Sequence, residues 1–231
     1  MKLSLRAGMV ALAAVLAFAL PPAITWMRGS GTAFPASASG RLRVADFGAE
    51  IPSTDARRLA DWIAASRDNA GASFAIIDKK FARLHVFDGA ARLQGSSAIL
   101  IGAAVGDDSV PGIGLRPIAE VRPEERTTPA GRFVAERGHN LRGEDVVWVS
   151  YADSVSMHPV LTDKPQEHRL ERLETSSFDD KRISYGCINV PAAFYQSSVL
   201  PAFAKQGALV YVLPEVKTLD QVFGFATAVA S

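Results

Sequence analysis

Cysteine is nearly absent from the sequence, because the 231 residues include only Cys187. A disulfide therefore cannot form within the chain. A large charge of either sign is also lacking, and the formal net charge of +1 gives no electrostatic case for nucleic acid or an anionic membrane surface. Asp107 and Asp108 stand without an accompanying cluster of ligands, so we expect a solvated loop there and no metal site.

The first 38 residues differ from the rest of the chain in their pattern. Lys2 and Arg6 precede an uncharged apolar run over residues 7–20, which is typical of an export signal. Small residues at 36–38 suit signal-peptidase cleavage, and an uncleaved membrane anchor is the alternative. Because no cysteine lies near residue 20, a lipoprotein anchor is excluded. We therefore expect a periplasmic or otherwise extracytoplasmic protein.

Export changes the meaning of the lone cysteine. In an oxidising compartment an unpaired thiol is either buried as a small apolar group or used chemically. Gly186 allows a tight turn beside Cys187, and Pro191 suits the first turn of a helix over residues 192–205. A cysteine ahead of a helix N-terminus is favoured as thiolate, so we predict a nucleophile.

The pattern of apolar residues predicts a mainly β domain, a sandwich or barrel with one helix after the cysteine. The predicted strands cover residues 74–78, 83–87, 98–105, 146–151, 154–158 and 208–213. A further helix, capped by Ser53 or Thr54, is expected to run to about Arg67 and to pack on this domain. The predicted organisation is a signal or anchor with linker (1–38), an N-terminal extension (39–72), a catalytic domain (73–214) and a tail (215–231).

A cysteine nucleophile needs a base within hydrogen-bond reach. The alternation over residues 154–158 places Ser156 and His158 on one face of a strand, where His158 would be held rigidly. His168 is the alternative base, but it lies in a polar, charged segment over residues 162–182 that is expected to be exposed. We therefore favour His158.

Residues 184–189, Ser-Tyr-Gly-Cys-Ile-Asn, resemble the signature of the L,D-transpeptidases (the YkuD-type domain). That signature usually reads Ser/Thr-His-Gly-Cys, then a hydrophobic residue, then Asn or Arg. Residues 128–133, Thr-Pro-Ala-Gly-Arg-Phe, are similar to the family's Thr-Pro-x-Gly-x-Phe turn, and the resemblance covers about residues 73–214. Two features depart from the pattern. Tyr185 replaces the usual histidine, and His168 fits the family's spacing better than His158, which we explain by an insertion over 162–182.

The resemblance implies a YkuD-like β fold and an enzyme that crosslinks peptidoglycan stem peptides containing diaminopimelate. Cys187 would attack a peptide carbonyl with His158 as base, while the N–H groups of Gly186 and Cys187 hold the oxyanion. Tyr185 would donate a hydrogen bond or shape the pocket. Arg182 would bind a stem carboxylate, and Ser184 and Asn189 would complete the substrate site and support the loop. No metal or organic cofactor is called for, and we expect a monomer that binds no nucleic acid.

Several alternatives remain open at this point. The crosslink could be the 3-3 linkage or, given Tyr185, a variant 1-3 linkage. With water as acceptor, the same site would make an L,D-carboxypeptidase. A catalytically decayed peptidoglycan-binding protein is the third possibility, because the motif histidine is missing.

Overall fold

The structure is a computed structural model that describes residues 43–205 and 207–224. The predicted signal or anchor lies outside the described residues, as does the end of the predicted tail. In the part of the chain that is described, no helix combines the length and the apolar character needed to cross a membrane.

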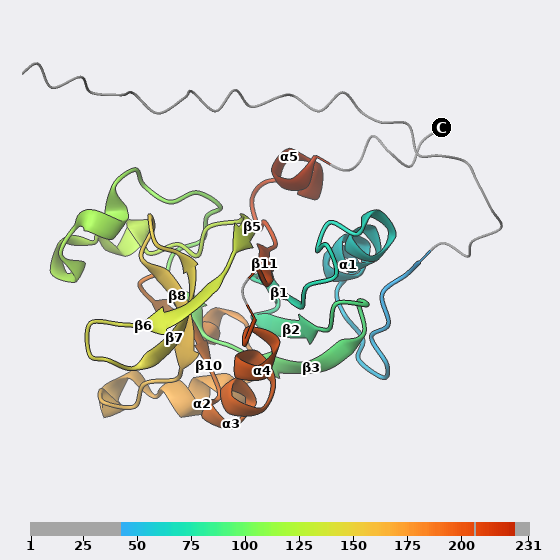
Figure 1. Ribbon diagram of the computed structural model, residues 1–231. Coiled ribbons are helices and arrows are strands. Elements are labelled where there is room, and N and C mark those ends of the chain that lie inside the picture. The colour runs from blue at the N-terminus through green and yellow to red at the C-terminus, as the bar shows by residue number, and fades with distance from the viewer. Residues whose placement is uncertain (1–42, 206, 225–231) are drawn as a thin grey trace, which may run out of the picture. The chain divides into compact units, whose positions relative to one another are not determined.

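The described chain has two larger sheets (Figure 1) and a third sheet of two strands. The five-stranded sheet has the order β3 (Leu93–Ala98), β2 (Arg83–Phe87), β1 (Phe74–Asp78), β11 (Leu209–Val212), β5 (Gly131–Val134). The four-stranded sheet has the order β10 (Ile188–Val190), β8 (Val155–Pro159), β7 (Asp145–Ser150), β6 (Glu136–His139). The two-stranded sheet pairs β4 (Ile101–Gly102) with β9 (Arg182–Ser184) in parallel.

The main core lies between the two larger sheets. It combines apolar side chains from both sheets, such as Ile77 and Val210 from one and Val147 and Met157 from the other. Tyr195, from the helical segment after β10, joins them. Alternation along the strands explains this arrangement, because every second side chain points to the same face.

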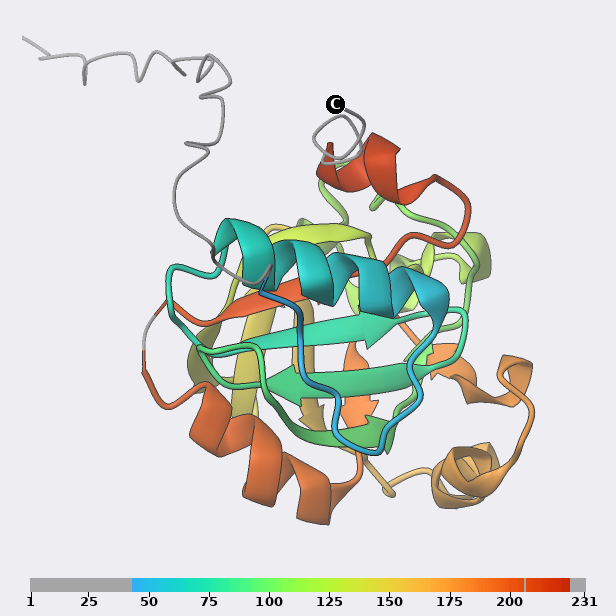
Figure 2. The same cartoon turned by 90° about the vertical axis from the view of Figure 1, so that its right-hand side faces the viewer.

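A second core covers the outer face of the five-stranded sheet. The helix α1 (Thr54–Ser66) lies across that face (Figure 2) and buries Leu59 and Ile63 against the ring of Phe74 and its neighbours. Ser53 caps α1 by accepting a hydrogen bond from the Ala56 N–H, as predicted. The fold is therefore strand-rich but mixed α/β, so the expectation of a mainly β domain holds in part.

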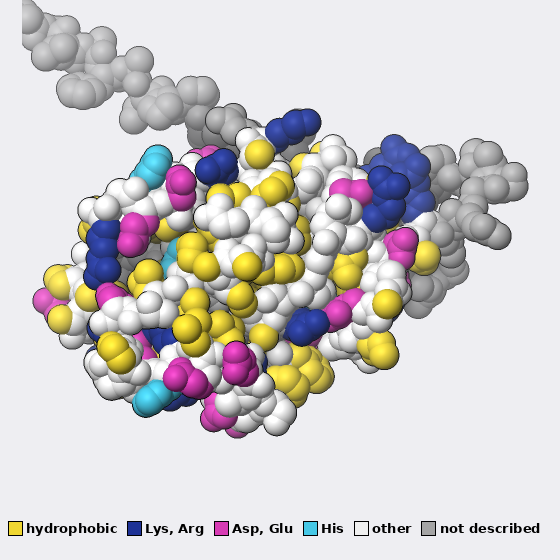
Figure 3. Space-filling model, turned by 90° about the horizontal axis from the view of Figure 1, so that it is seen from below, with side chains coloured by type: hydrophobic (Ala, Val, Ile, Leu, Met, Phe, Trp, Pro, Cys, Tyr) yellow, Lys and Arg dark blue, Asp and Glu magenta, His cyan; other side chains and the backbone are white. Residues whose placement is uncertain are grey.

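The remaining elements are short. The helices are α2 (Arg169–Glu174), α3 (Ala192–Phe194), a π-helical turn (Tyr195–Val199), α4 (Leu200–Ala202) and α5 (Leu219–Phe223). The 3-10 turns are η1 (Ile113–Leu115), η2 (Ile118–Glu120), η3 (Pro123–Glu125), η4 (Pro165–Glu167) and η5 (Asp179–Lys181). On the face that carries α2, α3 and α4, apolar side chains gather near the middle and charged side chains lie mostly around them (Figure 3).

Three sequence expectations need correction at this level. The predicted strand over 98–105 is replaced by β3, which ends at Ala98, and by the two-residue β4. The helix after the cysteine is interrupted by a π-helical turn and ends earlier than predicted, at Ala202. The charged segment 162–182 contains α2, which the sequence reading did not foresee.

Candidate active site

Parallel pairing of β8 with β10 brings the cysteine beside the predicted base. In this register Ile188 pairs with Met157 and Asn189 pairs with His158. Cys187 lies one residue before β10, at the end where β8 also begins. Met157 points into the core, so Ser156 and His158 face the other way, as the alternation predicted.

Three residues of this strand region lie close to the Cys187 sulfur. The thiol donates to the Ser154 carbonyl oxygen over 3.5 Å, and the Ser156 hydroxyl lies 3.7 Å from Sγ. His158 lies close enough to the sulfur to change the pKa of the thiol. His158 Nδ1 lies 2.8 Å from the Pro159 carbonyl oxygen, which can only accept, so Nδ1 carries a proton. Nε2 is therefore the nitrogen left to accept a proton from the thiol.

The cysteine and histidine favour each other's charged forms. Burial on its own raises the pKa of the Cys187 thiol, but the hydrogen bond and charge of His158 and the contacts of Ser156 outweigh it, so the pKa is lowered. Burial alone lowers the pKa of His158, and the Cys187 thiolate reverses this, so the pKa is raised. A thiolate beside an imidazolium is the state in which a cysteine attacks a carbonyl.

Gly186 gives the cysteine loop its sharp turn. Its φ of +127° lies in a region that other residues rarely adopt, and a Cβ there would lie 2.7 Å from the Thr127 carbonyl oxygen. The N–H of Gly186 donates to the Ser184 hydroxyl over 3.1 Å. The expectation that this N–H holds an oxyanion is therefore corrected, because the group is already engaged. Of the two predicted donors, the Cys187 N–H is the one that Ser184 does not engage.

Ser184 and Asn189 support the loop from within. The Ser184 hydroxyl donates to the Cys187 carbonyl oxygen over 2.6 Å, and the Asn189 amide donates to the same oxygen over 3.3 Å. Arg169 of α2 donates to the Asn189 side-chain oxygen over 2.6 Å. Since Ser184 and Asn189 are buried, they hold the nucleophile loop in place, and their expected contact with substrate is not supported.

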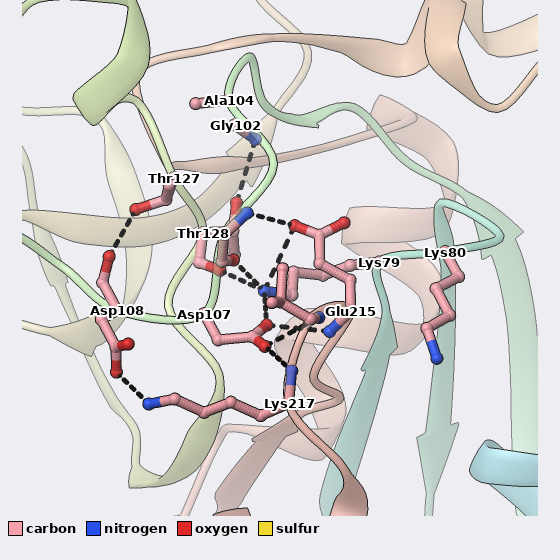
Figure 4. A network of polar contacts seen from close by, with 12 residues as sticks. Lys79, Lys80, Gly102, Ala104, Asp107, Asp108, Thr127, Thr128, Glu215 and Lys217 are labelled. Atoms are coloured by element: carbon pink, nitrogen blue, oxygen red, sulfur yellow. Dashed lines mark hydrogen bonds and ion pairs between the residues drawn. The ribbon is translucent and has the colours of Figure 1, made fainter.

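Thr128 joins the back of the cysteine loop to a buried charge network. Its hydroxyl donates to the Gly186 carbonyl oxygen over 2.8 Å. The same hydroxyl accepts from the Gly102 N–H over 2.9 Å, a contact drawn in Figure 4. Its own carbonyl oxygen accepts from Lys79 Nζ over 2.9 Å. Lys79 is almost completely buried and forms an ion pair of 2.8 Å with Asp107.

Asp107 lies at the centre of this network and is buried, so the expectation of a solvated loop is wrong for Asp107, whereas the Asp108 side chain is exposed as expected. Its carboxylate accepts the backbone N–H groups of Glu215, Val216 and Lys217. Burial alone would raise the pKa of Asp107, but these hydrogen bonds and Lys79 lower it to about 2. The network connects the end of β1, the 106–108 loop, the Thr128 turn and the segment after β11.

Arg182 belongs to the same network, which corrects its predicted role. Its guanidinium forms an ion pair with Glu215, and Glu215 also accepts from the Gly106 N–H over 2.9 Å. Nη1 of Arg182 lies 3.5 Å from the Gly102 carbonyl oxygen and 3.4 Å from that of Ala104. A side chain committed to these partners is not available to bind a stem carboxylate.

The structure separates the remaining candidates. The alternative base His168 is exposed and lies 3.7 Å from Glu171 in the turn before α2. It has no recorded contact with Cys187 among the described residues. The ring of Tyr185 lies under the guanidinium of Arg126, with 4.0 Å between the Arg126 Cζ and the ring centroid.

Several positioning residues escaped the sequence reading. Thr128 stands in the turn motif that resembles the family's, and Ser156 shares the strand face of His158. Both residues were therefore visible in the sequence, but neither was assigned a role beside Cys187. Nothing in the sequence showed that Lys79 is buried, because Lys79 and Lys80 together resemble an ordinary exposed turn. Its burial depends on residues more than 25 positions away in the chain.

Solved structures of L,D-transpeptidases are among those that this structure resembles. The structure is similar to L,D-transpeptidase catalytic domains, including that of Enterococcus faecium, with 17% identity over 62% of this chain and 98% of the other, at a TM-score of 0.34. An L,D-transpeptidase of Mycobacterium tuberculosis gives 13% identity over 61% of this chain and 57% of the other, at a TM-score of 0.38.

A particular protein of the same comparison is Pgp2, the helical cell shape determining protein of Campylobacter jejuni. It matches at 16% identity over 64% of this chain, with a TM-score of 0.42, and this chain spans about half (49%) of its length. No protein-family model and no curated protein matches the sequence.

Proposed function

We propose that this protein is a cysteine-dependent L,D-transpeptidase that crosslinks peptidoglycan stem peptides through a thioester acyl-enzyme. The observation that carries the proposal is the parallel pairing of β8 with β10, which brings Cys187 beside His158 within a loop whose sequence matches the family signature except at Tyr185. The acceptor would be the side-chain amine of diaminopimelate, and the linkage 3-3 or 1-3. The expected setting is extracytoplasmic, reached or anchored by the N-terminal segment.

The first half-reaction transfers the donor stem to the enzyme. The thiol proton passes to His158 Nε2, and the Cys187 sulfur attacks the carbonyl carbon of the scissile peptide bond. The Cys187 N–H is the backbone donor placed nearest to the developing oxyanion. When the intermediate collapses, His158 returns the proton to the departing D-amino acid, and a thioester remains on the sulfur.

The second half-reaction releases the enzyme. An acceptor amine attacks the thioester carbonyl, and His158 takes a proton from the attacking nitrogen. Collapse of this second intermediate expels the thiolate and leaves a new amide bond. The Pro159 carbonyl oxygen, which accepts from Nδ1, keeps the ring in the same tautomer and orientation throughout.

Mass spectrometry of muropeptides tests the proposal. The full chain and its Cys187→Ala variant are each incubated with purified tetrapeptide muropeptides. Dimers that depend on Cys187 support the proposal, and their fragmentation identifies the bond. Products that are the same with both proteins contradict it.

The second candidate is an L,D-carboxypeptidase, in which water replaces the amine. It is favoured by the partial exposure of the nucleophile, because Cys187 is only half-buried. Tripeptide monomers without dimers would identify this activity. The absence of any Cys187-dependent product would instead favour a peptidoglycan-binding protein with a decayed site.

A further inference from the structure

The segment between β4 and β5, residues 103–130, borders the thiol on one side through η1. Gly114 in η1 packs so closely on the turn before β8 that a Cβ would lie 2.3 Å from the Ala152 carbonyl oxygen. The Ser154 hydroxyl donates to the Gly114 carbonyl oxygen over 3.0 Å. The carbonyl oxygen of Ser154 itself accepts from the Cys187 thiol. This part of the segment is thus one residue removed from the sulfur.

The other end of the same segment borders the cysteine loop. Thr127 touches Gly186, and the preceding residue, Arg126, covers the ring of Tyr185. The Arg126 backbone is fixed, because its carbonyl oxygen accepts from the Ala104 N–H over 3.0 Å. Its guanidinium is oriented by the Val121 carbonyl oxygen, which accepts from Nε at 3.3 Å and from Nη2 at 3.2 Å.

Arg126 differs from the other arginines of this segment in its charge pairing. Arg116 and Arg122 both form ion pairs with the buried carboxylate of Glu125, at 3.1 Å and 2.9 Å. Arg182, which precedes the cysteine loop in the chain, is paired with Glu215. Within residues 43–205 and 207–224, no carboxylate forms an ion pair with Arg126. Its positive charge, stacked on the ring two residues before the nucleophile, therefore has no ion-pair partner among these residues.

We propose that Arg126 binds a carboxylate of the donor stem peptide next to the bond that Cys187 attacks, with Tyr185 as the platform that orients it. This inference rests on the proposed function and gives its substrate a recognition residue in place of Arg182. A planar guanidinium presents parallel N–H groups to a carboxylate, and stacking on an aromatic ring limits its freedom before the substrate arrives.

Tyr185 gains a specific role from this arrangement. It stands where the resembled family usually has histidine, and an imidazolium there would repel Arg126, whereas a neutral phenol ring attracts it. The substitution and the arginine are thus complementary. Two carboxylates of a tetrapeptide stem have the required chemistry, the diaminopimelate side-chain carboxylate and the C-terminal carboxylate of the leaving D-amino acid.

Equilibrium binding tests the inference without turnover. Calorimetry is performed on the full chain carrying Cys187→Ala, with three disaccharide tetrapeptides: the free acid, the form amidated at diaminopimelate and the form amidated at the C-terminus. Adding Arg126→Gln should weaken binding of the free acid about tenfold to a hundredfold, as expected for a charge-assisted hydrogen-bonded pair. Arg126→Lys should recover only part of this loss.

The amidated donors identify the carboxylate. Amidation of the carboxylate that Arg126 binds should weaken binding to the parent by a similar factor. With that amidated donor, the parent and Arg126→Gln should bind equally well. Tyr185→Phe should bind as the parent does, and Tyr185→Leu should bind more weakly. The matched control is Arg142→Gln. Arg142 is an exposed arginine of the β6–β7 turn that pairs with Asp163, and its substitution should leave the dissociation constant unchanged.

Three results would overturn the inference: equal binding of all three donors by the parent, equal binding of the free acid by the parent and Arg126→Gln, or no binding by the parent. If Arg126→Gln does not fold, the amidated donors and Tyr185→Leu decide the question. The product assay is independent of this one. Crosslinking without dependence on Arg126 would refute only the recognition role, and binding without turnover would refute only the transferase.

Discussion

The two sides of the cysteine loop are built in opposite ways. Behind the loop, Thr128, Lys79 and Asp107 are buried, and their polar groups are matched with one another and with the backbone. In front of it, Cys187 and His158 are half-buried and shift each other's pKa. The buried residues behind the loop therefore fix its backbone, and the half-buried residues in front of it provide the reactive groups. Changes behind the loop should therefore alter stability, and changes in front should alter chemistry alone.

The largest effect is expected in front of the loop, for His158→Ala. Loss of the base should reduce the rate of Cys187-dependent product formation by about 10²–10⁴-fold, the usual contribution of general acid–base catalysis. Because the side chain is half-buried and lies outside the core, the urea midpoint should change little. His168→Ala is the matched control and should retain the activity of the unmodified protein. A large loss in the control with none in His158→Ala would reverse the assignment of the base.

Behind the loop, Lys79→Met should be the most destabilising change. It leaves the Asp107 carboxylate buried without its cationic partner, and breaking a buried pair in this way costs about 3–5 kcal/mol. The measurement is the free energy of unfolding in urea. Lys80→Met provides the control, since Lys80 is exposed and its pair with Asp55 is 3.3 Å long at the surface. Equal, small effects of the two substitutions would remove the distinction between the two sides.

The difference between the two sides also explains what the sequence could and could not predict. The front was predictable, because alternation placed Ser156 and His158 on one face and the motif marked Cys187. The back was not, because Lys79, Asp107 and Glu215 come from distant segments that only the fold brings together. Arg182 and the Gly186 N–H were assigned to substrate because the sequence shows which groups could bind a substrate. The sequence does not show that Glu215 already pairs with Arg182, or that Ser184 already accepts from the Gly186 N–H.

A third histidine, His85, should make the stability of the folded protein depend on pH. His85 is buried with Nδ1 2.7 Å from the Ser96 hydroxyl, and burial lowers its pKa from 6.5 to about 4. The unfolded chain therefore binds more protons than the native protein between these values. Stability should fall as the pH drops through that window, by about 3 kcal/mol. Urea unfolding at pH 7.5 and pH 4 should show this loss in the unmodified protein and a smaller one in His85→Gln.

Gly186→Ala tests the junction between the two sides and should destabilise the protein less than Lys79→Met does. The new methyl group would meet the Thr127 carbonyl oxygen at 2.7 Å in an unfavourable backbone region, a combination that costs about 1–3 kcal/mol. Gly143→Ala is the control, because Gly143 also has a positive φ (+78°) but no atom within 4 Å of the added Cβ. Gly186→Ala should lose activity as well as stability, whereas Gly143→Ala should keep its activity.

The most direct test of the central claim is the pH dependence of Cys187 alkylation by iodoacetamide, followed by intact-protein mass spectrometry. Because the chain has one cysteine, each added group reports on Cys187 alone. The unmodified protein should react with an apparent thiol pKa below the ordinary value, and His158→Ala should move the profile to higher pH. Identical profiles for the two proteins would contradict the thiolate–imidazolium pair on which the proposed chemistry depends.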